Sequence, residues 1–103
     1  MIKNERLKKF EVIFTNDDPD FYDEFKIYIL GQNSNFWQIS FTCPCGCGDV
    51  IHLNLLNDSY PYWKFHKTQK GITISPSIRR TKRCKSHFFI KNGKTKWVIY
   101  DDY

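Results

Sequence analysis

The feature that most constrains this chain is the placement of its four cysteines, which all fall in two short motifs. Cys43-Pro44-Cys45-Gly46-Cys47 lies near the middle of the sequence, and Cys84-Lys85-Ser86-His87 follows 37 residues later. With no secretory signal at the N-terminus, we expect a reducing, cytoplasmic location, where clustered cysteines ligate metals more often than they form disulfides. A chain of 103 residues also has a small core, and a bound metal commonly supplements such a core.

The spacing of these motifs predicts a metal site that joins two hairpins. Proline fixes φ and glycine permits positive φ, so a knuckle of this composition can turn successive thiols toward one point. A knuckle paired with a distant second motif is typical of tetrahedral Zn²⁺. Zn²⁺ is the favoured metal, and an iron–sulfur cluster is the weaker alternative.

Five candidate ligands compete for four positions in this site: Cys43, Cys45, Cys47, Cys84 and His87. One set takes both ends of the knuckle together with Cys84 and His87, which leaves Cys45 spare. A second set takes Cys45 in place of Cys43. The spacing alone does not decide between them.

Alternating and β-branched segments predict a mainly β domain of small antiparallel sheets and hairpins, with little or no helix. The third of these segments places Trp37, Ile39 and Phe41 on the inward face. Asn92-Gly93 is a strong hairpin signal between the last two segments. The expected strands are 10–15, 26–30, 36–42, 50–56, 62–66, 71–75, 87–91 and 94–100.

Length and composition predict a single domain, residues 1–103, with 41% hydrophobic and 17% aromatic residues. The apolar runs are too short to span a membrane. Net charge is +5 but uneven, because residues 1–50 carry −3 and residues 51–103 carry +8. Such asymmetry marks either a face for an anionic partner or two solvated surfaces of opposite charge.

Catalytic residues are weakly indicated, and the best candidates are Asp49 and Ser86. Asp49 could act as general base toward a water on an open metal position. A serine, or an unligated Cys45 near His87, could act as nucleophile. We favour the interpretation in which the hydroxyls bond thiolate sulfurs and turn amides around the metal, and in which Asp49 is a turn residue.

The basic run that leads to Cys84 is a candidate partner-binding surface. Its cations could balance the negative charge of thiolates on zinc, or they could bind an external anion. Trp63 could add a stacking surface, which makes nucleic-acid binding the alternative function. The residues concerned are Arg79, Arg80, Lys82, Arg83, Lys85 and Trp63.

Several motifs together resemble a bacterial family, domain-of-unknown-function 6527, over roughly residues 36 to 99. They are Phe41–Gly48, Ile51–Leu56, Pro61-Tyr62-Trp63, Ser75-Pro76-Ser77-Ile78, Cys84–Ile90 and Asn92-Gly93. One departure is Arg79, which follows Pro-Ser-Ile where an aromatic residue or glycine is expected.

This resemblance implies a setting in operons for ubiquitin-like protein modification, beside a ubiquitin-like protein and homologues of its activating and conjugating enzymes. It therefore predicts a zinc-binding protein of such a pathway, whose partner is the ubiquitin-like protein or its conjugation enzymes. The protein would be either the processing or deconjugating peptidase or an adaptor. A zinc-dependent peptidase and a purely structural zinc remain equal alternatives.

Overall fold

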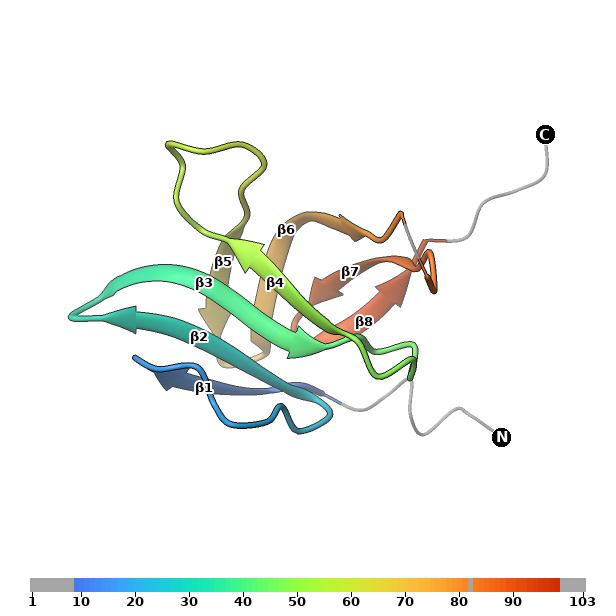
Figure 1. The fold of residues 1–103 in the computed structure, drawn as a ribbon, viewed down its shortest axis with the longest axis horizontal. Helices are drawn as coiled ribbons and strands as arrows, with labels where there is room; N and C mark the ends of the chain where they lie inside the picture. Colours follow the sequence, from blue (N-terminus) through green and yellow to red (C-terminus); the bar gives the residue numbers. More distant parts are fainter. Residues whose placement is uncertain (1–8, 82, 99–103) are drawn as a thin grey trace.

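Alternating apolar and polar residues build two four-stranded sheets that pack face to face (Figure 1), as this computed structural model of the chain shows. The structure describes residues 9–81 and 83–98, and these contain no helix. The mainly β fold with hairpins is therefore confirmed. The strands are β1 (Glu11–Thr15), β2 (Lys26–Gln32), β3 (Asn35–Thr42), β4 (Val50–Asn54), β5 (Lys64–Thr68), β6 (Gly71–Arg79), β7 (His87–Lys91) and β8 (Lys94–Trp97).

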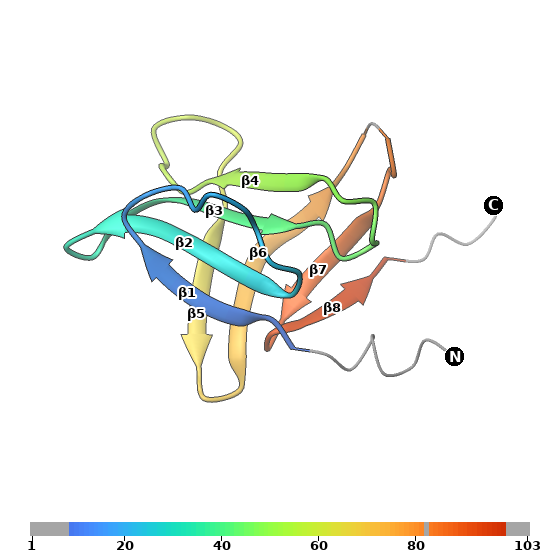
Figure 2. The same ribbon diagram turned by 60° about the horizontal axis from the view of Figure 1, so that its bottom comes forward.

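Each sheet is a run of sequential strands, in the orders β1-β2-β3-β4 and β5-β6-β7-β8. All the pairs are antiparallel except β1–β2, which is parallel, in contrast to the antiparallel pairing expected from the sequence. The second sheet crosses the first at a steep angle, and this is clearest when the molecule is turned (Figure 2). The predicted last strand is shorter than expected, and its residues 99 and 100 lie outside the described residues.

The core lies between the two sheets and consists mainly of isoleucine and phenylalanine. Phe41 from the first sheet meets Phe88 from the second edge to face, with ring centroids 6.3 Å apart. Both of these side chains are fully buried. Aromatic pairs of this geometry add stabilisation beyond the area they bury. The inward placement of Ile39 and Phe41 is as predicted.

Trp37 does not face the core, and that part of the prediction is wrong. The β2–β3 ladder shifts register between Leu30 and Gly31, which pair with Gln38 and Phe36 and leave Trp37 out of the ladder. An irregularity of this kind reverses which residues face inward. Trp37 is consequently 37% exposed, whereas Phe36 packs against the core and beside Phe65.

The β3–β4 and β6–β7 connections, which carry the cysteine motifs, lie at the same end of the molecule (Figures 1 and 2). One connection belongs to each sheet. A link between them therefore ties the two layers together. No helix that is long and apolar enough to cross a membrane occurs in the described part of the chain.

The register shift predicts that Phe36→Ala destabilises the fold more than Trp37→Ala does. Phe36 is half-buried against the core, so we expect a loss of about 2 kcal/mol, below the roughly 3–5 kcal/mol of a fully buried phenylalanine. The exposed Trp37 should cost about 1 kcal/mol or less. Urea unfolding of the two variants measures both losses. Equal losses, or a larger one at Trp37, would contradict the observed register.

Candidate functional site

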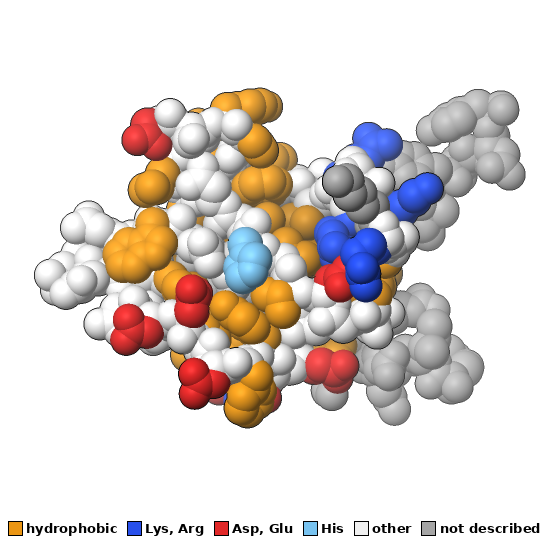
Figure 3. All heavy atoms as spheres, in the orientation of Figure 1, with side chains coloured by type: hydrophobic (Ala, Val, Ile, Leu, Met, Phe, Trp, Pro, Cys, Tyr) orange, Lys and Arg blue, Asp and Glu red, His pale blue; other side chains and the backbone are white. Residues whose placement is uncertain are grey.

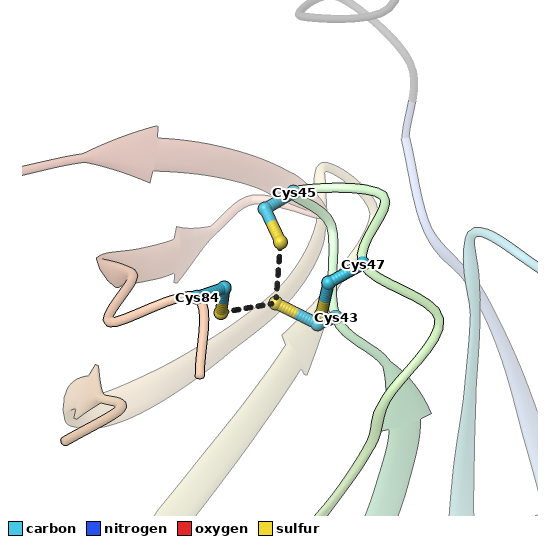
Figure 4. A group of neighbouring side chains, drawn as sticks. All are labelled: Cys43, Cys45, Cys47 and Cys84. Carbon is cyan, nitrogen blue, oxygen red and sulfur yellow. Dashed lines mark hydrogen bonds between the residues drawn. The ribbon is translucent and has the colours of Figure 1, made fainter. Parts of the chain in front are cut away.

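Four thiols from two hairpins meet at the end of the sandwich (Figure 4). Cys43, Cys45 and Cys47 come from the β3–β4 connection, and Cys84 comes from the β6–β7 connection. Their sulfur atoms all lie within 4.8 Å of one another. The structure thus joins the two cysteine motifs at one place, and each sheet contributes to the group.

The distances between these sulfurs suit a tetrahedral metal ion. Bonds of about 2.3 Å from zinc to sulfur place tetrahedral thiolates about 3.8 Å apart. The Sγ atom of Cys43 lies 3.4 Å from that of Cys45 and 3.8 Å from that of Cys84. Sulfur-only ligation suits zinc and iron–sulfur centres, and it disfavours magnesium or calcium. Four cysteines therefore fit a closed metal site.

The backbone of the knuckle explains how three thiols so close in sequence can converge. The amide of Cys43 donates to the carbonyl of Asp49 at 2.8 Å, which closes the loop, and the amide of Gly46 donates to the carbonyl of Cys43 at 3.2 Å. Gly46 adopts φ +92°, a conformation that favours glycine. The turn thereby points both Cys45 and Cys47 back toward Cys43 (Figure 4).

The pKa values of the Cys43 and Cys84 thiols are shifted in opposite directions. Burial raises the pKa of the Cys43 thiol to about 12. Burial acts in the same sense on Cys84, but hydrogen bonds from the side chain and backbone of Ser86 lower the pKa of its thiol to about 6. Ser86 therefore favours the thiolate of Cys84, in agreement with the supporting role expected for hydroxyls near the metal.

Asp49 is held by two arginines of the basic run. Its carboxylate accepts from Nη2 of Arg80 at 3.0 Å and lies 2.6 Å from Nε of Arg83. The hydrogen bond from Arg80, together with the charges of both arginines, lowers the pKa of this carboxyl group. Arg80 also points Nη1 toward the sulfur of Cys84 at 3.8 Å. The guanidinium thus lies between a carboxylate and a thiol, and this matches the internal counter-charge considered from the sequence.

The other described residues of the basic run lie at the surface. Figure 3 shows Lys and Arg side chains gathered around an acidic one at this end of the molecule. Arg79 and Lys85 are exposed, whereas Lys82 lies outside the described residues. Trp63 is half-buried against the core, and its indole nitrogen donates to the carbonyl of Ser77 at 3.3 Å, so most of this side chain is unavailable for stacking on a base.

His87 lies outside the group of four cysteines whose sulfur atoms meet. Its Nε2 atom lies 2.8 Å from Oγ of Ser77. Both side chains are half-buried, and the ring of Phe89 stacks beside the imidazole with centroids 6.5 Å apart. A serine hydroxyl at this distance from an imidazole nitrogen is the pairing that activates a serine nucleophile.

A bulge in β6 brings Ser77 to this position. Ile74 pairs with Ile90 and Ile78 pairs with Phe88, so the residues between them, which include Ser77, form an irregularity in the ladder. The Ser75–Pro76 peptide bond within it is cis. Bulges often re-aim side chains beside active sites. The hydrogen bond from Trp63 to the Ser77 carbonyl fixes this segment further.

A second serine–histidine pair occurs on the first sheet. Ser40 and His52 are cross-strand partners on β3 and β4, with Oγ 2.7 Å from Nδ1, and the amide of Gln38 bonds the same hydroxyl at 2.8 Å. Ser40 is fully buried, whereas Ser77 is partly exposed. A buried hydroxyl with two partners cannot reach a substrate carbonyl, so we assign this pair to holding β3 and β4 together.

The sequence prediction did not single out the pair of Ser77 and His87. The sequence indicates Ser86 as the candidate catalytic serine, and it places His87 in both candidate ligand sets. The evidence for the pair is in the β6–β7 ladder, where Arg79 pairs with His87 and Ser77 lies two residues before Arg79 on the adjacent strand. Only the pairing of β6 with β7 reveals this proximity.

Comparison with known protein families gives a match over residues 14–98 to the family described as "Bacterial ubiquitination-like system serine protease (BubE)". The chain belongs to this family. This supports the expected ubiquitin-like pathway, although the matching family carries a different name from the domain of unknown function that the sequence resembles. No curated protein and no solved structure matches the chain.

The geometry predicts that a metal ion binds through the four thiols and without His87. Cobalt is a suitable probe, because its thiolate charge-transfer absorption grows with the number of sulfur ligands. We expect Cys45→Ser to lower this absorption and His87→Ala to leave it unchanged. The measurement is a cobalt titration of the metal-stripped chain, with unfolding on chelation as a second readout, since metal affinity is coupled to folding. Loss of the absorption band in His87→Ala would instead show that the metal is held by three cysteines and His87.

Proposed function

We propose that this chain is a serine protease that cleaves the bond at the carboxyl end of a ubiquitin-like modifier. Ser77 is the nucleophile and His87 is its general base. The observation that carries the proposal is the 2.8 Å approach of Ser77 Oγ to His87 Nε2 on a solvent-accessible face. The family's description as a serine protease of a ubiquitination-like system supports both the reaction and the class of substrate.

The reaction follows from this geometry in two steps. The imidazole accepts the hydroxyl proton at Nε2 as Ser77 Oγ forms a bond to the scissile carbonyl carbon. The same proton then passes to the leaving amine as the carbon–nitrogen bond breaks, which leaves an acyl-enzyme. Water attacks this ester with His87 again as base, and Ser77 regains its proton as the modifier departs with a free carboxylate.

We further propose that the four cysteines hold Zn²⁺ in a structural role. Zinc prefers tetrahedral thiolate ligation, and four protein ligands leave no position for a water or a substrate. When bound, zinc would supply a fixed cross-link between the two hairpins and no chemistry at the scissile bond. Arg80 supports this role, because it lies 3.8 Å from the sulfur of Cys84 and would offset the negative charge of the site. Asp49, which is paired with two arginines, is then part of this charge balance and not a base.

Labelling with a fluorophosphonate tests the nucleophile without requiring the natural substrate. An activated serine displaces fluoride and forms a stable phosphonate ester, which intact-mass spectrometry detects and peptide mapping locates. We expect labelling at Ser77 in the zinc-loaded chain. Ser77→Ala and His87→Ala should lower the labelling rate by at least about a thousandfold, as for loss of either member of such a pair.

Ser40→Ala is the matched control, since it removes the serine of the other serine–histidine pair. It should leave labelling of Ser77 unchanged. The same variants should rank in the same order when cleaving a fusion of the ubiquitin-like protein to a C-terminal reporter. Labelling that persists in Ser77→Ala, or that maps to Ser40, would rule out this assignment.

A further inference from the structure

An open groove of about 470 Å³ adjoins the pair of Ser77 and His87 on the outward face of the second sheet. Phe89 lines it and stacks beside His87, and Ser75, two residues before Ser77, lines it as well. Through Phe89 and Ser75, one end of the groove therefore lies beside the pair of Ser77 and His87, although neither of the two lines it. Its volume is within the range of pockets that bury small ligands or short peptide segments.

The groove is apolar where it lies nearest the nucleophile. Phe89 is 44% exposed and Trp97 is 38% exposed, and both line it. Exposed aromatic side chains that share a concave surface are typical of sites that bind apolar groups of a partner. The strands β6, β7 and β8 all contribute, so the surface is carried by rigid elements and not by a loop.

Beyond Phe89 the groove runs into a hollow surrounded by lysines. This hollow, about 550 Å³, shares Lys91 and Lys96 with the groove, and no acidic side chain lines it within the described part of the chain. Among residues 9–81 and 83–98 the ion pairs involve other cations, and Lys9 Nζ donates to the carbonyl of Lys70 at 3.0 Å. No described carboxylate therefore neutralises the charge of these lysines, which can face an external anion. Its lysines, called here the lysine cluster, are Lys9, Lys70, Lys91, Lys94 and Lys96.

We propose that the groove and the lysine cluster together bind the ubiquitin-like modifier: its extended carboxyl-terminal segment lies in the groove, and an acidic patch of its folded part lies against the lysines. This proposal rests on the proposed function. It adds that an acidic patch of the modifier is recognised, and that the lysine cluster and the groove residues recognise it. The modifier's chain end would present apolar side chains to Phe89 and its last carbonyl to Ser77.

Two observations favour the modifier over the opposite side of the scissile bond. The side that leaves as an amine can be a single lysine side chain, which needs no long groove, whereas the acyl side is always a continuous peptide. The groove and the hollow also share Lys91 and Lys96, so one partner can occupy both. Charge complementarity at the far end then speeds encounter and excludes partners without an acidic patch.

Reversal of charge in the lysine cluster tests the recognition of the modifier. In Lys91→Glu/Lys96→Glu, the KM for the reporter fusion should rise at least about tenfold at low salt with little change in kcat. The difference from wild type should shrink between about 0.05 M and about 0.5 M NaCl, because salt screens exposed charges. Lys64→Glu/Lys67→Glu, which reverses two exposed lysines on β5, is the matched control and should leave KM unchanged.

Removal of the aromatic surface tests the groove. Phe89→Ala should lower kcat/KM for the fusion at least about tenfold more than it lowers the rate of fluorophosphonate labelling of Ser77. Equal falls in kcat/KM and in the labelling rate would show that Phe89 only positions His87, and they would overturn the role of the groove. A KM that does not respond to the lysine reversal would likewise overturn the role of the cluster.

A binding measurement keeps this inference separate from the proposed function. The full chain with Ser77→Ala is titrated with the ubiquitin-like protein, and the lysine reversal is expected to weaken binding whether or not Ser77 is the nucleophile. If Ser77 labels as expected but this binding is insensitive to the lysines, the inference alone fails. Tighter binding of a DNA oligonucleotide than of the modifier, lost on the same reversal, would assign the cluster to nucleic acid and overturn the proposal.

Discussion

The contact on which the placement of Ser77 and His87 depends is the meeting of four thiols between the two sheets. Each sheet has its own hairpins, and at this end the cysteines join the β3–β4 connection to the β6–β7 connection. β6 and β7 carry Ser77 and His87, and Cys84 lies just before β7. A bound metal would therefore fix the end of the hairpin on which the serine–histidine distance depends, although it would lie outside the reaction itself.

Much of the fold follows from the sequence, because alternation decides which side of a strand faces the core. The strand positions, the Asn92-Gly93 hairpin and the burial of Ile39 and Phe41 all agree with this rule. The rule fails at Trp37 because the register shift depends on the partner strand. There, a side chain on Gly31 would come within 2.4 Å of the ring of Phe36. Close approach of two strands is a tertiary property that no pattern within one strand contains.

The site was only partly predictable for a related reason. The spacing of four clustered cysteines is enough to predict a metal site. A histidine in a C-x-x-H motif, however, is equally suited to bind a metal and to pair with a serine. An imidazole nitrogen accepts either partner, so the choice is made by distance. The bulge in β6 supplies that distance by placing Ser77 at 2.8 Å from His87. The sequence around Ser77 carries no sign of the pairing, because the ladder that creates it joins separate segments.

Two groups of basic residues lie in different surroundings. Arg80 and Arg83 both pair with Asp49, and Arg80 also lies 3.8 Å from the sulfur of Cys84, so part of the basic run has its counter-charge within the fold. The lysine cluster has no carboxylate partner among the described residues, and it adjoins the groove whose Phe89 stacks beside His87. Uncompensated charge on a folded surface costs self-repulsion, and a binding partner of opposite sign relieves that cost. The lysines, and not the arginine-rich run noticed first in the sequence, are therefore the part of the +5 net charge that recognition of an acidic partner can use.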